Sequence, residues 1–168
     1  MPTKVCSAKS YPEAIILSDL LEADEEAIEE QPFTARQGKQ VYRFRARRGR
    51  KEFLMQVQGN DTLGDLDAVM REAFGLEMFD HLAEFSLIVS HGKQKQAQSF
   101  GVIDPAGEHA ACSVRLAGLG LAPGAHLEYL YDLGDATQFA LLLEAIEEPE
   151  AKVRYPRYRP VGSKSRKA

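Results

Sequence analysis

The distribution of apolar and polar residues predicts a hairpin followed by a helix in the first half of the chain. Apolar residues alternate with arginines over 41–47 and with polar residues over 52–57, as in strands that have one buried side. A short glycine-containing loop joins them, so we expect a β-hairpin. Apolar residues recur at steps of three and four over 62–74, between a capping Thr62 and a terminating Gly75. The side chains that this helix should bury are Leu66, Val69, Met70 and Phe74.

The second half of the chain predicts more strands. "FSLIV" at 85–89 indicates a third strand, and 90–111 is rich in Gln, Lys and Gly and is expected to be a polar loop. Alternation over 127–132 and an apolar run over 138–146 indicate two further strands. A hairpin, a helix across it and then more strands is the order of a β-grasp-like (ubiquitin-like) α+β fold. We therefore predict a mixed sheet with one main packed helix.

Charge is distributed unevenly and suggests an extension at each end. Residues 11–35 contain eight acidic residues and no basic one, and their apolar spacing predicts an acidic N-terminal helix. Residues 151–168 contain seven basic residues and no acidic one. The expected organisation is an acidic helical extension over 1–35, an α+β domain over 36–150, and a basic C-terminal tail over 151–168.

Composition narrows the function classes. The chain has 168 residues with 44% apolar content, and no apolar run reaches the length of a membrane helix or forms a secretory signal. Two cysteines, Cys6 and Cys112, are too few for a disulfide framework. We expect a cytoplasmic protein with no membrane partner. The glycines of "GLGLAPG" lack the Lys-Ser/Thr of a phosphate loop, and no cofactor is expected.

Several strings occur in a specific order within residues 41–156. The strongest are "TLGDLDAVMREAFG", "HLAEF" and "YLYDLGD". Together they resemble the pRi-plasmid ORF-3-like family, whose members are also described as insertion-element passenger TnpR-like proteins. The resemblance implies an association with mobile elements and does not imply a particular reaction.

The chain departs from that family at polar positions. Relatives commonly read His-Leu-His-x-Phe where residues 81–85 read His-Leu-Ala-Glu-Phe, and they carry Trp and His where this chain has Thr137 and Phe139. If relatives build a polar site from these residues, most of it is missing here. The residues that remain as a possible polar site are His81, Asp132 and Asp135.

No residue pattern predicts catalysis or a metal. The four histidines show no HxH or HxxxH spacing, there is no CxxC, and no serine lies in a Gly-x-Ser-x-Gly context. Asp80 and His81 with Asp132 and Asp135 form the best cluster, and aspartates at such positions more often cap turns. The first hypothesis is therefore a non-catalytic protein-interaction domain with an unknown protein partner.

The alternative is a nucleic-acid-binding accessory protein of a mobile element. Basic residues in the hairpin and tail could neutralise phosphates, and the candidate contacts are Arg43, Arg45, Arg47, Arg154, Arg157 and Arg159. A row of like charges on one strand is unfavourable unless an anion lies near. Two anions are available: the chain's own acidic segment, Glu22 to Glu30, folded back over the row, or nucleic acid.

Overall fold

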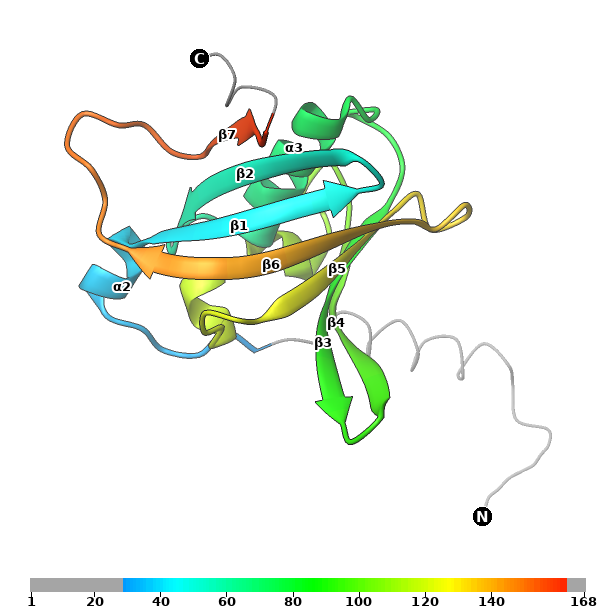
Figure 1. Ribbon diagram of the computed structural model, residues 1–168, viewed down its shortest axis with the longest axis horizontal. Helices are drawn as coiled ribbons and strands as arrows, with labels where there is room; N and C mark the ends of the chain where they lie inside the picture. The colour runs from blue at the N-terminus through cyan, green and yellow to red at the C-terminus, as the bar shows by residue number, and fades with distance from the viewer. Residues whose placement is uncertain (1–28, 163–168) are drawn as a thin grey trace.

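The structure is a computed structural model that describes residues 29–162 (Figure 1). The acidic helix expected before residue 29 and the end of the basic tail lie outside the described residues. Strands dominate the described chain. In order, its elements are α2 (Ala35–Lys39), β1 (Val41–Arg48), β2 (Lys51–Gln58), α3 (Leu63–Phe74), β3 (Ala83–His91), β4 (Gln94–Ile103), the 3₁₀ turns η1 (Ala110–Ser113) and η2 (Leu116–Leu119), β5 (His126–Tyr131), β6 (Thr137–Glu147) and β7 (Arg157–Pro160).

The first hairpin and the following helix form where the sequence pattern predicts them. β1 and β2 pair antiparallel along their whole length. The hydroxyl of Thr62 accepts a hydrogen bond from the Asp65 amide, and the Asp65 carboxylate accepts one from the Thr62 amide, which caps α3 reciprocally. Gly75 follows the helix with a φ of 69°, a left-handed conformation that glycine adopts without strain.

The β-grasp prediction is wrong, because the sheet is antiparallel throughout. The seven strands of the described chain follow the order β4-β3-β5-β6-β1-β2-β7, and every neighbouring pair is antiparallel. A mixed sheet needs at least one parallel pair, and β1 is flanked by β2 and β6, both antiparallel to it. The described part of the protein is therefore mostly one antiparallel sheet with two short helices, and the mixed α+β class is not supported.

Two strands that the sequence pattern did not indicate account for part of this error. β4 lies within the stretch predicted to be a loop, and its first six residues are exposed, so no apolar alternation marks it. β7 lies within the predicted basic tail and pairs with β2, from Phe53 opposite Pro160 to Gln56 opposite Arg157. Both are edge strands, where burial imposes the weakest pattern on the sequence.

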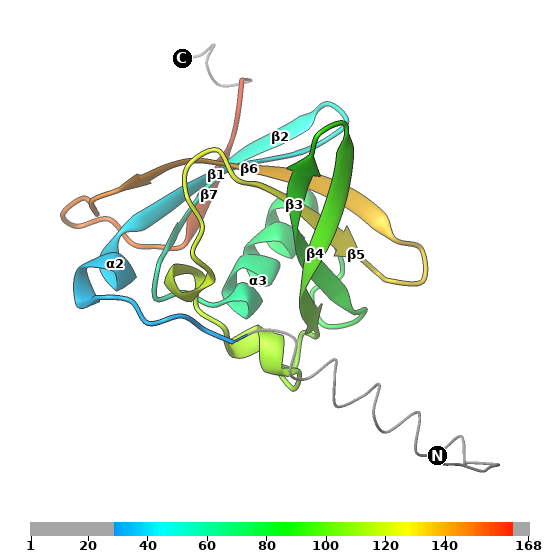
Figure 2. The same cartoon turned by 90° about the horizontal axis from the view of Figure 1, so that it is seen from below.

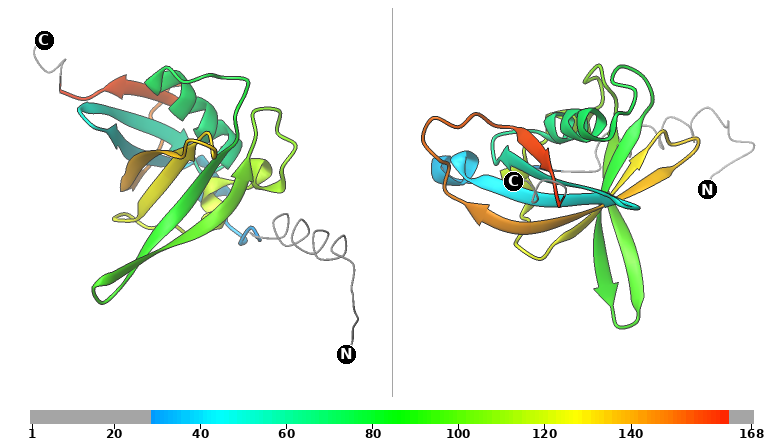
Figure 3. Two further views of the ribbon diagram at one scale, coloured as in Figure 1. Left: turned by 90° about the vertical axis from the view of Figure 1, so that its right-hand side faces the viewer. Right: turned by 45° about the horizontal axis from the view of Figure 1, so that its top comes forward.

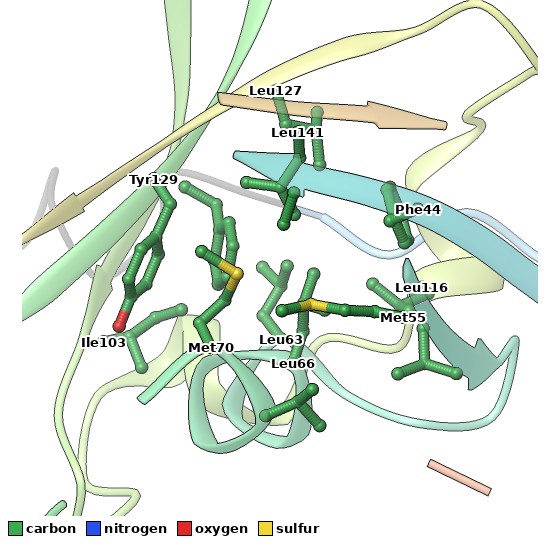
Figure 4. Close-up of a cluster of buried hydrophobic side chains, with 14 of the residues drawn as sticks. Phe44, Met55, Leu63, Leu66, Met70, Ile103, Leu116, Leu127, Tyr129 and Leu141 are labelled. Carbon is green, nitrogen blue, oxygen red and sulfur yellow. The ribbon is translucent and has the colours of Figure 1, made fainter. Parts of the chain in front are cut away.

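The core lies between the sheet and α3. Phe44, Met55 and Leu141 of the strands meet Leu66 and Met70 of α3, and all five are buried (Figure 4). The four helix side chains that were expected to be buried are indeed buried. Figure 2 shows α3 on one side of the sheet, while no helix of the described chain covers the other side.

Candidate functional site

Five of the six arginines predicted to contact an anion share the side of the sheet that faces away from the core. Residues directly opposite one another in an antiparallel sheet lie on the same face. Arg45 lies opposite Leu54, which lies opposite Arg159. The neighbouring row consists of Arg43, Gln56 and Arg157. Arg47 follows Arg43 and Arg45 on the same side of β1. We call this side of β1, β2, β6 and β7 the open face. The sixth arginine, Arg154, lies in the loop before β7.

Glutamates on adjacent strands neutralise two of these arginines. Glu144 of β6 lies 2.5 Å from the Nε of Arg45 and 3.4 Å from the Nε of Arg43. Glu147 lies 2.5 Å from Arg43 Nη1, and Glu52 lies 3.7 Å from Arg45 Nη1. The pairing of β1 with β6 is irregular directly after Arg43, as in a β-bulge, and such bulges redirect side chains. The sheet therefore supplies its own negative charges to neutralise Arg43 and Arg45.

The described end of the acidic segment contacts a different surface. The Glu30 carboxylate accepts hydrogen bonds from the Arg115 backbone amide and from Arg115 Nη2, both at 2.7 Å. These hydrogen bonds lower the pKa of Glu30. The Arg115 guanidinium also lies over the ring of Phe33, 4.6 Å from its centroid. Residues 22–28 lie outside the described residues, so the masking hypothesis stays a prediction for them.

Positive charge remains on the open face beyond these ion pairs. Within residues 29–162, Arg47 and Arg159 form no ion pair with a carboxylate. Arg157 donates a hydrogen bond from Nε to the side-chain oxygen of Gln56 at 2.6 Å and lies over the ring of Tyr155. As far as residues 29–162 are concerned, three cations from two strands thus lack a carboxylate partner and are available to an external anion.

A groove of about 520 Å³ adjoins the open face, between the β1–β2 turn and the β3–β4 hairpin. Arg47 and Arg48 line one side, and Lys95 lines the other. His126 of β5 is an exposed part of its floor, and Glu128 is the one carboxylate among the described lining residues. We call this feature the basic groove, since its cations outnumber its carboxylate.

The structure brings together two of the three residues predicted to remain from a polar site. His81 Nδ1 lies 3.6 Å from Asp132 Oδ2, and the two residues have left-handed φ values of 73° and 62°. The imidazole packs edge-on against the ring of Tyr131, with centroids 5.6 Å apart. Asp135 is exposed, and in the described chain no hydrogen bond or ion pair joins it to this pair.

The positions where this chain departs from the family pattern belong largely to the core. Ala83 is fully buried opposite Tyr131, and Phe139 is buried opposite Tyr129. Thr137 is half-buried at the start of β6. Ala83 and Phe139 therefore serve the packing of the core, and they give the pair of His81 and Asp132 no further polar partner.

A buried polar network beside this pair was missed by the sequence reasoning. Arg71 Nε donates to both carboxylate oxygens of Asp67 at 3.0 Å, and the Tyr129 hydroxyl donates to Asp67 Oδ1 at 2.5 Å. All three residues are at most 3% exposed. Burial, together with the charge of Asp67, raises the pKa of Tyr129, so the phenol stays protonated and donates. The four-residue spacing of Asp67 and Arg71 on a helix was the available signal.

Arg71 also fixes the chain that follows α3. Nη1 donates to the carbonyl oxygens of Glu77 (3.0 Å) and Asp80, and Nη2 donates to that of His81 (2.7 Å). Its guanidinium lies over the ring of Tyr131, 5.1 Å from the centroid. The buried arginine thereby positions His81 next to Asp132.

Arg71 also lines a cavity of about 490 Å³ that has Asp104 and Cys112 in its wall. The Asp104 carboxylate accepts hydrogen bonds from the amides of Glu108 and His109, and Oδ1 lies 2.7 Å from His109 Nδ1. Burial alone raises the pKa of Asp104, but these hydrogen bonds and one from Cys112 outweigh it and hold the pKa well below its usual range. The carboxylate is thus an anion that organises the turn.

Cys112 in this cavity lacks the features of a nucleophile. Its thiol donates to Asp104, and within residues 29–162 no histidine side chain is its hydrogen-bond partner. Burial raises the pKa of the thiol, whereas a reactive cysteine needs a lowered one. The cavity therefore gives no support to nucleophilic catalysis by Cys112.

We predict that Asp104→Asn weakens the pH dependence of stability in acid. Because folding lowers the pKa of Asp104, its stabilisation is complete above the unfolded value of about 3.9 and is lost as pH falls towards the folded pKa. The variant should be less stable than wild type at neutral pH, with a difference that shrinks below about pH 4. Urea unfolding over a pH series measures this. Asp135→Asn, on an exposed carboxylate, is the control, and identical profiles for Asp104→Asn and wild type contradict the assignment.

The described residues hold neither a cluster of metal-ligating side chains nor a membrane-spanning helix. Within residues 29–162, no three His, Cys, Asp or Glu side chains are grouped so that they could hold a metal ion. None of the helices in that range is both long and apolar enough to cross a lipid bilayer.

Comparisons with known proteins agree with the fold and the sequence motifs. The crystal structure of a protein of unknown function from Methanosarcina mazei Go1 is similar, with a TM-score of 0.53 and 21% identity. The match covers 71% of this chain and 68% of that chain, and at this identity it shows the fold alone. A search of curated proteins finds no match. A family model described as plasmid pRiA4b ORF-3-like protein matches residues 54–164. Since that match spans more than half of the sequence, the protein belongs to the plasmid pRiA4b ORF-3-like family.

Proposed function

We propose that this protein is a non-catalytic nucleic-acid-binding module that uses its open face and basic groove. The observation that carries the proposal is the unpaired positive charge on one surface: Arg47, Arg157 and Arg159 share the open face and have no carboxylate partner in the described chain. Arg48 and Lys95 extend this charge into the basic groove. A phosphate backbone is an anion that can contact several such cations along a line.

The ion pairs on the same face support a binding role. Glu144 and Glu147 hold Arg43 and Arg45 in place. They do not neutralise the charges of Arg47, Arg157 and Arg159. Side chains that are already fixed lose little conformational entropy on binding, which favours an ordered contact surface. The whole chain is slightly acidic, with a formal charge of −4, so binding depends on local charge and not on net charge.

The first test compares wild type with two double variants and measures their affinity for a mixed-sequence DNA duplex at low salt. Arg47→Gln combined with Arg159→Gln should weaken binding about tenfold, because two phosphate contacts are lost. The matched control is Lys39→Gln with Lys152→Gln, which removes the same charge from exposed positions outside the open face. Equal affinities for all three proteins, or equal losses in both variants, contradict the proposal.

A protein-interaction domain is the second candidate, and the free edge of β4 favours it. β4 is the terminal strand of the sheet, and Gln94–Ser99 are exposed. An unpaired strand edge can accept an extended segment of another protein. A pull-down with nuclease treatment separates the candidates, because a protein partner stays bound when nucleic acid is removed.

The sequence implied a cytoplasmic protein associated with a mobile element. Both the location and that association stay predictions.

A further inference from the structure

The β3–β4 hairpin extends beyond the body of the sheet. β3 pairs with β5 as far as Ile88 opposite His126, whereas its pairing with β4 continues to His91 opposite Gln94. The residues after Ile88 therefore form a two-stranded ribbon that we call the arm, residues 89–96. Figures 2 and 3 show the arm projecting from the side of the sheet opposite α3. Ser90 and Lys95 of the arm line the basic groove together with residues of the β1–β2 hairpin.

The composition of the arm differs from that of the rest of the protein. No acidic residue occurs between Phe85 and Ile103, although charged residues make up 27% of the chain. Every residue from Ser90 to Ser99 is exposed. Apart from one alanine, the exposed side chains are those of lysine, glutamine, serine and histidine, which can donate hydrogen bonds, and the two lysines carry positive charge. An exposed ribbon with this composition suits a polyanion.

The two faces of the arm carry different side chains. Ser90 lies opposite Lys95, and both line the basic groove. Val89 lies opposite Gln96 and His91 opposite Gln94, so these side chains occupy the other face. One face therefore presents a cation towards Arg47 and Arg48 across the groove, and the other presents two glutamines, Gln94 and Gln96.

We propose that the arm enters the major groove of duplex DNA while one phosphate backbone lies in the basic groove. This inference rests on the proposed function and assigns its partner. The major groove of B-form DNA is about 12 Å wide and admits a two-stranded ribbon. A backbone held between Arg47, Arg48 and Lys95 places the arm in the adjoining groove. Glutamine and lysine are side-chain types that hydrogen-bond to base edges there.

Other nucleic acids fit the same features less well. The major groove of A-form RNA is deep and narrow, so the arm cannot reach the bases of an RNA duplex. Single-stranded nucleic acid is held by stacking on aromatic rings, and the arm contains no Phe, Tyr or Trp. The chemistry and shape of the arm therefore select duplex DNA.

The test uses the full-length chain and three probes of the same sequence: plain duplex DNA, duplex DNA whose cytosines carry a glucosyl group in the major groove, and duplex RNA. Wild type should bind the plain DNA at least about tenfold more tightly than either other probe, because both close the major groove to the arm. Equal affinity for plain and glucosylated DNA overturns the inference.

Variants of the arm sharpen this test. Lys93→Gln with Lys95→Gln should reduce affinity for plain DNA about tenfold, whereas Lys39→Gln with Lys152→Gln should leave it unchanged. All four positions are exposed, and thermal unfolding checks that each variant folds. If wild type binds plain DNA but the arm variant binds equally well, the inference is overturned, and the proposed function stands only for the arginines of the open face. Binding to no probe overturns both.

Discussion

Arg71→Ala should lower the free energy of unfolding by about 3–5 kcal/mol, the usual cost of removing one partner of a buried ion pair. Arg71 is 1% exposed, and its removal leaves the Asp67 carboxylate buried with the Tyr129 hydroxyl as its remaining hydrogen-bond donor. The carbonyl oxygens of Asp80 and His81 lose their donor as well, whereas that of Glu77 keeps the Tyr131 hydroxyl. An uncompensated buried carboxylate and unsatisfied carbonyl groups both penalise the folded state. Urea unfolding at neutral pH measures the difference.

Two controls separate burial from charge in this experiment. Arg71→Lys keeps the positive charge but cannot reproduce the forked contacts of the guanidinium, so it should also be destabilising. Arg36→Ala removes an ion pair with Glu148 in which both side chains are more than half exposed, so it should change stability far less than Arg71→Ala. A loss below about 1 kcal/mol for Arg71→Ala contradicts the role given to the network.

Leu66→Ala should cost about 2–5 kcal/mol of stability, as truncation of a fully buried leucine does elsewhere. Leu66 has no exposed surface and points from α3 into the space between helix and sheet (Figure 4). The substitution removes apolar contacts and leaves a cavity that the packed surroundings fill only in part. Thermal or urea unfolding provides the measurement.

The matched control for Leu66→Ala is Leu82→Ala. Leu82 is 40% exposed in the segment before β3, so the same truncation there should change stability far less. If the two variants lose equal stability, α3 does not form the core contact that the structure assigns to it.

The elements with strong local signals were predictable from the sequence. The alternation of β1 and β2, and the Thr62 cap and Gly75 stop of α3, depend on residues close together in the chain. The arrangement of strands was not predictable in the same way, because strand direction depends on pairing between distant segments. The path of β6 beside β1 settled the antiparallel topology, and no local pattern encodes it.

The same distinction between local patterns and distant pairing applies to the candidate sites. Alternation places Arg43, Arg45 and Arg47 on one face, but the partners Glu144 and Glu147 come from a distant strand. The addition of Arg157 and Arg159 to that face required β7, which lies in a stretch without apolar periodicity. A local pattern indicates the side of a strand on which a charge lies, while tertiary pairing determines whether that charge is neutralised.

The salt dependence of DNA binding by the full-length chain tests the central claim most directly. The slope of log affinity against log salt concentration is about −0.9 for each phosphate neutralised on duplex DNA. Three unpaired arginines therefore predict a negative slope with a magnitude of about 3 or more. Arg47→Gln with Arg159→Gln should reduce the magnitude of that slope by about 2. Binding that is absent at the lowest salt, or an affinity that does not change with salt, would contradict the claim that the open face binds nucleic acid.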